Sequence, residues 1–282
     1  MNCKIAPFAL LWLLFATGAS FVNATENGKL LGTSGVSSIE GSAGGGIIPW
    51  ATLSGYATRE EVGVSLASST AHVDDYSLQV HGVSINIQDR LELSFAHQDF
   101  YSDALAQSIR QNIIGLKARI AGDLVYDALP LISVGMQYKT LVDDDIAKLL
   151  GADDTSGTDL YVSMAKAWIN GPLHRTSFAN ANLRYTEANE LGLLGYGGPE
   201  SNSKLLFEVA AGLFITKDIA LGAEYRQKRN HLSSVKEDSW ADIFVAWFPS
   251  KAVSITAAYL DLGEIAGQES QQGAYLSLQA SF

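Results

Sequence analysis

Histidine is the residue type in this sequence best suited to catalysis or metal binding, and five histidines are present. They are His72, His81, His97, His174 and His231. None stands in the H-x-x-x-H or H-x-E spacing that zinc sites use, and no G-x-S-x-G motif marks a serine nucleophile. The sequence therefore predicts no metal site, no cofactor and no catalytic residue.

A serine beside a histidine is the other arrangement that could support hydrolysis. A serine hydroxyl becomes a nucleophile when a histidine base lies within hydrogen-bonding reach. His81 with Ser84 and His97 with Ser94 are the candidate pairs, and a membrane-embedded lipid hydrolase would use such a pair. Serines are frequent along the chain, so polar wall residues are the favoured interpretation. An enzyme is not predicted, and lipid hydrolysis stays as a third alternative.

Charged side chains inside otherwise apolar segments carry more information. Lysine or arginine at the midplane of a bilayer costs about 2–4 kcal/mol, so such charges on membrane-crossing strands should face a lumen. In chain order they are Lys117, Arg119, Lys139 and Arg184, then Glu208, Glu224 with Arg226, and Asp242. A basic wall beside an acidic wall would create a field that orients polar solutes and tunes ion selectivity. The alternative is that these charges pair with each other and hold the structure shut.

The first residues of the chain have the layout of a secretory signal. A short positive start at Lys4 precedes an apolar run over residues 5–15, and small residues end at Ala24. The apolar run is shorter than the about 20 residues that a membrane-spanning helix needs. We therefore expect a cleaved signal peptide over residues 1–24 and a mature domain over residues 25–282. The one cysteine, Cys3, is removed with the signal, so disulfides are not expected.

The composition limits the partners and the architecture. Thirty acidic residues against 19 basic ones argue against a nucleic-acid partner. No long apolar segment follows the expected signal peptide, so a helical membrane span is not predicted. A closed β-barrel is the other structure that crosses a bilayer.

Two-residue alternation recurs along the chain and supports a barrel. Val253, Ile255 and Ala257, for example, alternate with Ser254 and Thr256. Segments of this kind have the length of membrane-crossing strands. The predicted strands are 36–43, 50–57, 62–71, 76–87, 91–100, 109–120, 131–140, 159–169, 176–187, 204–215, 219–227, 239–248, 253–261 and 273–282.

The connections between these segments alternate in length. Short, turn-rich links, such as 88–90 and 216–218, alternate with longer polar links, such as 141–158 and 188–203. Outer-membrane barrels produce this alternation with short periplasmic turns and longer outer loops, whereas soluble β-sandwiches have no reason to. The fold class is therefore predicted as all-β, a transmembrane antiparallel β-barrel of about 14 strands. Residues 25–48, rich in glycine and serine, could instead tuck inside and leave 12.

Two details of the strands can be tested against a structure. In the fourth strand the apolar positions switch parity between Val80 and Val83, and Gly82 at the switch predicts a β-bulge. In the last strand Leu276 and Leu278 should face lipid, while Ser277 and Gln279 should face the lumen. The chain ends on Phe282. It resembles bacterial outer-membrane barrels in this, whose last strand closes the ring and whose terminal aromatic residue is read by the barrel assembly machinery.

Two stretches, residues 35–50 and residues 75–96, are similar to an uncharacterised family of Gram-negative outer-membrane proteins with a domain of unknown function. The first reads GVSSIEGSAGGGIIPW, and the second includes DYSLQVHG and DRLELSFA. The resemblance implies a porin-like barrel, an outer-membrane location and contact with outer-membrane lipid. It implies no substrate.

Passive diffusion of small solutes through a monomeric or trimeric barrel is the leading functional prediction. Apolar residues at positions expected to face inward, such as Leu206, Phe214 and Phe244, leave open a channel for hydrophobic compounds as well as a polar one. The second alternative is a structural or adhesion barrel that transports nothing because its lumen is plugged. The solute and the oligomeric state do not follow from the sequence.

Overall fold

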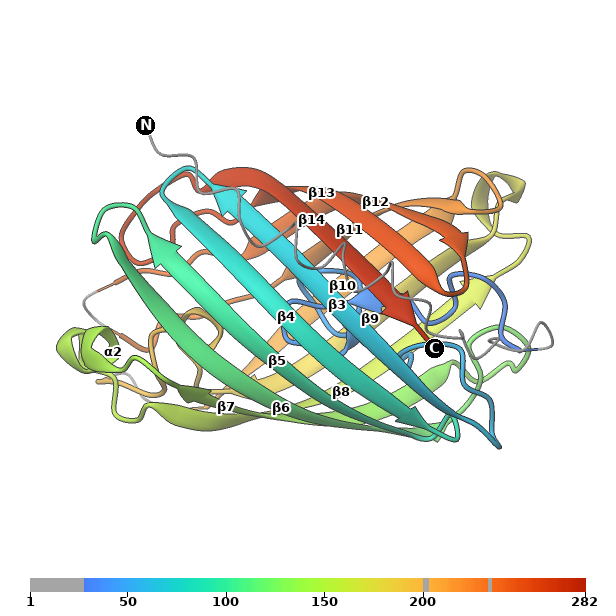
Figure 1. The fold of residues 1–282 in the computed structure, drawn as a ribbon, viewed down its shortest axis with the longest axis horizontal. Coiled ribbons are helices and arrows are strands. Elements are labelled where there is room, and N and C mark those ends of the chain that lie inside the picture. Colours follow the sequence, from blue (N-terminus) through green and yellow to red (C-terminus); the bar gives the residue numbers. More distant parts are fainter. Residues whose placement is uncertain (1–27, 200–202, 233–234) are drawn as a thin grey trace, which may run out of the picture.

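The structure is a computed structural model that describes residues 28–199, 203–232 and 235–282. The expected signal peptide, residues 1–24, lies outside these described residues. Twelve antiparallel strands, β3 to β14, form a closed barrel in which each strand pairs with its neighbours along the chain (Figure 1). Pairing of β14 with β3 closes the ring.

The wall strands follow one another around the ring, and the four longest links, which come after β7, β9, β11 and β13, lie at the same end of the barrel. They are β3 (Val62–Val73), β4 (Tyr76–Ile87), β5 (Leu91–Ser102), β6 (Gln107–Ala121), β7 (Leu131–Leu141), β8 (Ser156–Trp168), β9 (Ser177–Thr186), β10 (Lys204–Phe214), β11 (Ile219–Arg226), β12 (Trp240–Ser250), β13 (Val253–Asp261) and β14 (Gln272–Ser281). Helix α2 (Asp145–Leu150) and the single turns η1 (Pro172–His174) and η2 (Glu190–Gly192) lie in the links. We call the end that carries Phe282 the turn end and the opposite end the loop end.

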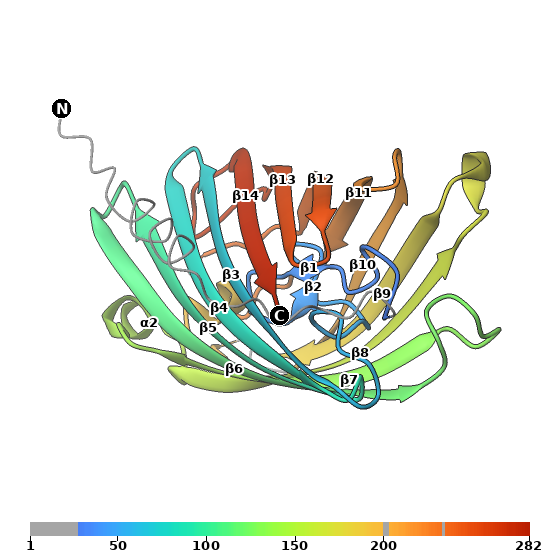
Figure 2. The ribbon, with the colours of Figure 1, turned by 45° about the vertical axis from the view of Figure 1, so that its right-hand side comes forward.

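The first two predicted strands, 36–43 and 50–57, are not part of the wall. Residues 34–57 lie inside the ring, and nearly every one of them is buried (Figure 2). Their regular structure is limited to β1 (Val36–Ser37) and β2 (Ala43–Gly44), which pair with each other. We call residues 34–57 the plug. The prediction with 12 strands and an N-terminal segment tucked inside is confirmed, and the count of 14 is replaced by it.

Side chains alternate between an exposed apolar outer face and a buried inner face. On β12, Ile243 and Trp247 are 62% and 44% exposed, whereas Asp242 and Phe244, on either side of Ile243, are 5% and 2% exposed. Large apolar side chains on the outside of a closed barrel are the mark of a lipid-facing surface. The last strand has the predicted faces, with Leu276 exposed outside and Ser277 buried inside. No helix among the described residues is long and apolar enough to cross a membrane.

Tyrosines end the apolar outer face on several strands. Tyr138, Tyr225 and Tyr259 are exposed and occupy the fourth outward position from the turn end on β7, β11 and β13. Amphipathic rings at this place form the interfacial girdle of membrane barrels. This tyrosine girdle marks the level at which the apolar face ends toward the loop end.

The predicted bulge at Gly82 does not form. The registers of β4 with β3 and with β5 run through Gly82 without a shift. Leu78 and Val80 instead point inward and join the buried apolar cluster. The prediction was wrong because the lumen near the loop end is apolar, so apolar side chains occupy the inner face there.

Candidate functional site

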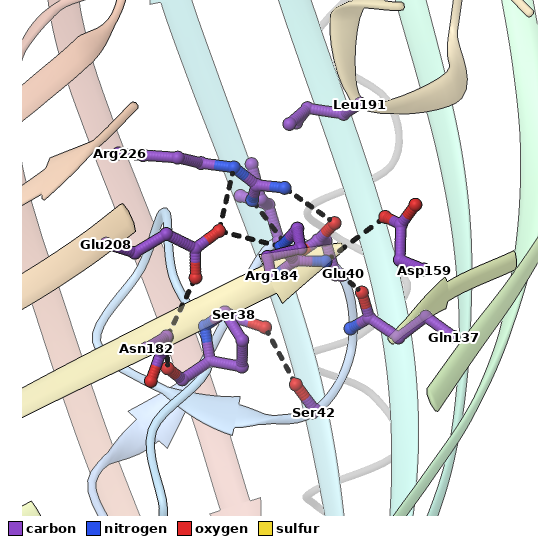
Figure 3. Close-up of polar contacts among 12 residues, drawn as sticks. Ser38, Glu40, Ser42, Gln137, Asp159, Asn182, Arg184, Leu191, Glu208 and Arg226 are labelled. Atoms are coloured by element: carbon purple, nitrogen blue, oxygen red, sulfur yellow. Dashed lines mark hydrogen bonds and ion pairs between the residues drawn. The ribbon is translucent and has the colours of Figure 1, made fainter. Parts of the chain in front are cut away.

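Glu40 is the one charged residue of the plug, and it lies at the centre of the lumen. Its carboxylate is fully buried and accepts hydrogen bonds from three cations on three strands (Figure 3). The Lys139 ammonium is 2.6 Å from Oε1, the Arg184 guanidinium 2.9 Å from Oε2, and the Arg226 guanidinium 3.0 and 3.1 Å from the two oxygens. Three wall strands therefore bind the plug through one carboxylate.

Two wall carboxylates balance the remaining positive charge. Asp159 lies 2.8 Å from Lys139 and 3.1 Å from Arg184. Glu208 lies 2.7 Å from Arg184 and 3.4 Å from Arg226. We call these six residues the central cluster: Glu40, Lys139, Asp159, Arg184, Glu208 and Arg226. Three carboxylates against three cations make it neutral.

Electrostatics keep the Glu40 carboxylate ionised in spite of its burial. Burial by itself raises the pKa of this group, because a charge is costly away from water. Arg184, Arg226 and Lys139 outweigh burial and hold the pKa of Glu40 well below its usual range. The plug is thus bound by charge at ordinary pH values.

A second ion pair grips the backbone of the plug. Lys117 and Glu92 lie 3.3 Å apart and are both buried. Lys117 donates to the carbonyl oxygens of Ala43 and Thr52 at 2.9 Å each. Glu92 accepts from the amides of Ala43 at 3.1 Å and Ser54 at 2.7 Å. One pair of side chains therefore fixes two separate stretches of the plug.

An acidic pair holds the third part of the plug. Glu224 accepts hydrogen bonds at 2.8 Å from the amide of Ile47 and from the Trp50 indole. Asp242 lies directly opposite Glu224 on the next strand and is also buried. Within the described part of the chain, neither carboxylate has an ion-pair partner, and Asp242 Oδ1 has no hydrogen bond. In the central cluster, by contrast, each carboxylate is paired with at least two cations.

The structure places seven of the eight charges predicted to line the lumen in its buried interior, namely Lys117, Lys139, Arg184, Glu208, Glu224, Arg226 and Asp242. Arg119 lies apart at the turn end, paired with Asp89 at 2.5 Å and Asp123 at 3.2 Å. Five of the buried charges bind one another, Glu92 or the plug through ion pairs. This arrangement matches the alternative in which the charges pair with each other and hold the barrel shut. A transverse field across an open pore stays a prediction.

The two serine–histidine pairs considered from the sequence do not form. Positions three apart on a strand face opposite sides, so His81 is outside while Ser84 is buried inside, and His97 and Ser94 are separated in the same way. A lipid hydrolase built on either pair is therefore wrong. No group of three or more His, Cys, Asp or Glu side chains in the described ranges is placed to hold a metal ion.

Sequence reasoning missed Glu40 and Asp159 as members of the site. Glu40 was assigned to a wall strand, where a single glutamate looks like any other lumen charge. Its isolation was the available signal, because residues 34–57 contain no other charged side chain. Asp159 begins the predicted strand 159–169 and was left uninterpreted there.

Cavities lie on both sides of the plug. Toward the loop end, an apolar cavity of about 40 Å³ is lined by Ile39, Ile47, Tyr76, Phe100 and Trp240, among others. Toward the turn end, one of about 70 Å³ is lined by Leu31, Trp50, Phe178 and Phe214, among others. A third, of about 170 Å³, opens beside Lys29, Arg119 and Tyr126. The plug therefore stands between separate spaces at the two ends.

A small charged cluster lies beside the loop-end cavity. Lys228 pairs with Glu190 and, at 3.1 Å, with Glu237, and its ammonium lies 4.4 Å from the ring centre of Trp240. Two buried carboxylates share this one cation. Burial, opposed by Lys228 and reinforced by Glu237, raises the pKa of Glu190 to about 8. A proton on Glu190 at neutral pH restores the charge balance.

Comparisons with known proteins were made by sequence and by shape. A family model described as "Protein of unknown function (DUF3034)" matches residues 33–279. The search of curated proteins found no match.

Three solved barrels are similar in shape at low sequence identity. The outer membrane protein Omp33 of Acinetobacter baumannii is 10% identical, with 80% of this chain and 100% of that chain covered at a TM-score of 0.49. The NanC porin is 10% identical, with 78% and 98% covered at 0.48. The KdgM porin is 10% identical, with 77% and 99% covered at 0.47.

Proposed function

We propose that this chain, which belongs to the DUF3034 family of proteins of unknown function, is an outer-membrane channel closed at rest by its own plug. Small solutes pass when the plug shifts. The exposed apolar outer face and the tyrosine girdle support a place in a membrane. The expected signal peptide and the terminal Phe282 support the outer membrane of a Gram-negative bacterium, with the turn end in the periplasm.

The observation that carries this proposal is the one-sided attachment of the plug. Side chains of β4 to β9 and of β11 supply its hydrogen bonds and ion pairs, joined by one long bond of 3.5 Å from Tyr275. Among the described residues, β12, β13 and β3 give the plug no side-chain hydrogen bond. A plug bound by polar contacts on one side and mainly by apolar packing on the other leaves a line along which a path can open.

The facing wall has the side chains that such a path needs. Inward residues of β13, β14 and β3 include Ser254, Thr256, Ser277 and Ser69, all of which are small and buried. The hydroxyls of Ser254 and Thr256 have no hydrogen-bond partner among the residues that the structure describes, and buried hydroxyls normally have one. Small side chains with unused hydroxyls suit a boundary between plug and wall that admits water and solute once the plug shifts.

The solute we propose is small and partly apolar. The loop-end cavity is lined by aromatic and aliphatic side chains, whereas the lumen of a general porin is polar. The charges of the central cluster are engaged with the plug and are not presented to a solute. An aromatic acid or a similar amphipathic compound fits this lining better than a sugar.

Planar-bilayer conductance of the purified protein tests the proposal. Glu40→Gln keeps the shape of the side chain but removes the charge that binds three cations, so we expect openings several-fold more frequent than in the wild type. Deletion of residues 34–57 should leave the barrel permanently open. Asp143→Asn, which breaks an exposed pair with Arg110 far from the plug, should behave as the wild type and serves as the control.

A non-transporting barrel is the second candidate, and the three cations on Glu40 favour it, because they bind the plug strongly. Liposome swelling with sugars, amino acids and aromatic acids separates the two functions. If the deletion variant conducts while wild type and Glu40→Gln stay closed to every solute, the channel proposal fails and the plug is a permanent filling.

A further inference from the structure

A row of four polar side chains crosses the outer wall of the barrel at one level. Ser68 on β3 pairs with His81 on β4, His81 with His97 on β5, and His97 with Asn112 on β6. All four face outward. Ser68, His81 and His97 hold the fourth outward position from the turn end, the position that Tyr138, Tyr225 and Tyr259 hold elsewhere. Histidines thus replace the tyrosine girdle on this side.

Hydrogen bonds at Nδ1 are compatible with a lone pair on Nε2 in both rings. His97 Nδ1 lies 2.8 Å from Asn112 Oδ1, and an amide oxygen only accepts. Neutral His97 therefore carries its proton on Nδ1, and Nε2 presents a lone pair. His81 Nδ1 lies 3.1 Å from the Ser68 hydroxyl, which can accept in the same way. Both rings can thus offer an unprotonated Nε2.

The placement of the rings puts the two Nε2 atoms on the facing sides of a directly opposed pair. Directly opposed residues on antiparallel strands have Cβ atoms about 4.5–5.5 Å apart. His81 Nδ1 is bound toward β3 and His97 Nδ1 toward β6, so the two Nδ1 atoms point away from each other. The Nε2 atoms are left at the outer edge of the pair, and no hydrogen bond from the described residues engages either one.

We propose that His81 and His97 bind one divalent transition-metal ion, such as Zn²⁺, through their Nε2 atoms on the outer wall. Imidazole is a common ligand for these ions. A metal-binding histidine usually donates its other ring N–H to an oxygen, which is the role of Asn112 and Ser68. Two protein ligands leave the remaining positions of a tetrahedral ion to water.

The surroundings allow a hydrated ion to reach the pair. The next outward residues toward the loop end are Gln79 and Asp99, which are polar and directly opposed. The next ones toward the turn end are Val83 and Phe95, which continue the apolar outer face. The pair therefore lies where lipid ends and water begins. Asp99 Oδ1 is buried without a hydrogen-bond partner and adds negative charge nearby.

Calorimetric titration of Zn²⁺ or Ni²⁺ into the tag-free full-length protein in detergent micelles at pH 7.5 tests this site. We expect saturation at one ion per chain. His81→Ala and His97→Ala should each weaken binding at least about tenfold. His174→Ala, which changes a histidine of η1 at the turn end, is the control and should leave the affinity unchanged. Lowering the pH to 5 should also weaken binding, because protons compete with a metal ion for imidazole nitrogens.

Asn112→Ala tests the positioning of His97. It should weaken binding severalfold while keeping one ion per chain, and Asn112→Asp, which restores an oxygen acceptor, should recover the affinity. The proposal is overturned if no saturable binding occurs at millimolar metal. It is also overturned if the double variant His81→Ala, His97→Ala binds as the wild type does. Neither result bears on conductance, so this test is independent of the channel.

Discussion

Glu40 forms the ion pairs that attach the plug to Lys139, Arg184 and Arg226 of the wall. Glu40→Gln leaves Lys139, Arg184 and Arg226 buried with only two carboxylates, and an uncompensated buried charge costs about 3–5 kcal/mol. We therefore expect hydrogen exchange in residues 34–57 to accelerate strongly. Mass-resolved exchange of the refolded protein in micelles measures this.

The matched control for Glu40→Gln is Asp143→Asn. It removes a carboxylate from an ion pair that is exposed to solvent, so its effect on exchange should be small. Equal exchange of the plug in wild type and Glu40→Gln would mean that packing of the plug, not the central cluster, holds it in place.

Glu190 gives the loop end a dependence on pH. A carboxyl whose folded pKa is about 8 stabilises the folded arrangement fully below its ordinary value near 4.5, and this contribution is lost as the pH rises through 8. Residues 187–199 should therefore open more readily at pH 9 than at pH 6. Hydrogen exchange corrected for the intrinsic rate at each pH detects this, and Glu190→Gln should abolish the trend. A pH-independent loop in the wild type would contradict the prediction.

At the scale of residues, inward charges were predictable because lipid excludes them. Arg184 and Glu208 lie on strands whose side chains alternate between lipid and lumen, and only the lumen can accommodate their charges. Their partners were not predictable, since the central cluster joins five strands and the plug, and sequence spacing carries no information about such contacts. Glu40 was misplaced because residues 36–43, which lie inside the ring, were predicted as a wall strand.

At the scale of elements, most wall strands followed from alternation alone. The predicted strands 76–87 and 253–261 have the bounds of β4 and β13. Alternation fails where both faces of a segment are buried, and this is the situation of residues 36–43 and 50–57. In the plug, serine side chains and glycine residues are buried as fully as isoleucine, so polarity no longer separates two faces.

Phe282, at the end of β14, allows two roles to be tested separately: closure of the barrel through its backbone, and recognition of its ring by the assembly machinery. Phe282 exchanges backbone hydrogen bonds with Val64 at 2.8 and 3.0 Å, while its side chain is 37% exposed. Phe282→Ala keeps these bonds, so refolding of the purified protein in vitro should be nearly unchanged.

In cells, the same variant should lower the fraction of protein assembled in the outer membrane, because the terminal ring is what the barrel assembly machinery is expected to bind. Heat-modifiable gel migration of membrane fractions measures this fraction. Leu129→Ala, which trims another exposed apolar side chain at the turn end, is the control. Equal assembly of Phe282→Ala and wild type would remove the proposed role of the ring.

At the scale of the whole molecule, the outer face predicts how the barrel responds to charge. Leu116 points outward near the middle of β6, where arginine costs about 2–4 kcal/mol in a bilayer. Leu116→Arg should lower the free energy of unfolding from lipid vesicles by this amount. Leu105→Arg, in the exposed link after β5, should have little effect. Equal stabilities of the two variants would contradict the lipid-facing assignment.

The position of the plug in the chain has a consequence for the order of assembly. The plug precedes all twelve wall strands, yet Glu40 binds residues that lie 99, 144 and 186 positions later. Contacts between such distant parts of a chain form slowly, because closing long loops costs entropy before any contact forms. Glu40 therefore finds its full set of partners only after β11 is in place, and we expect docking of the plug to be a late kinetic step that follows formation of most of the wall.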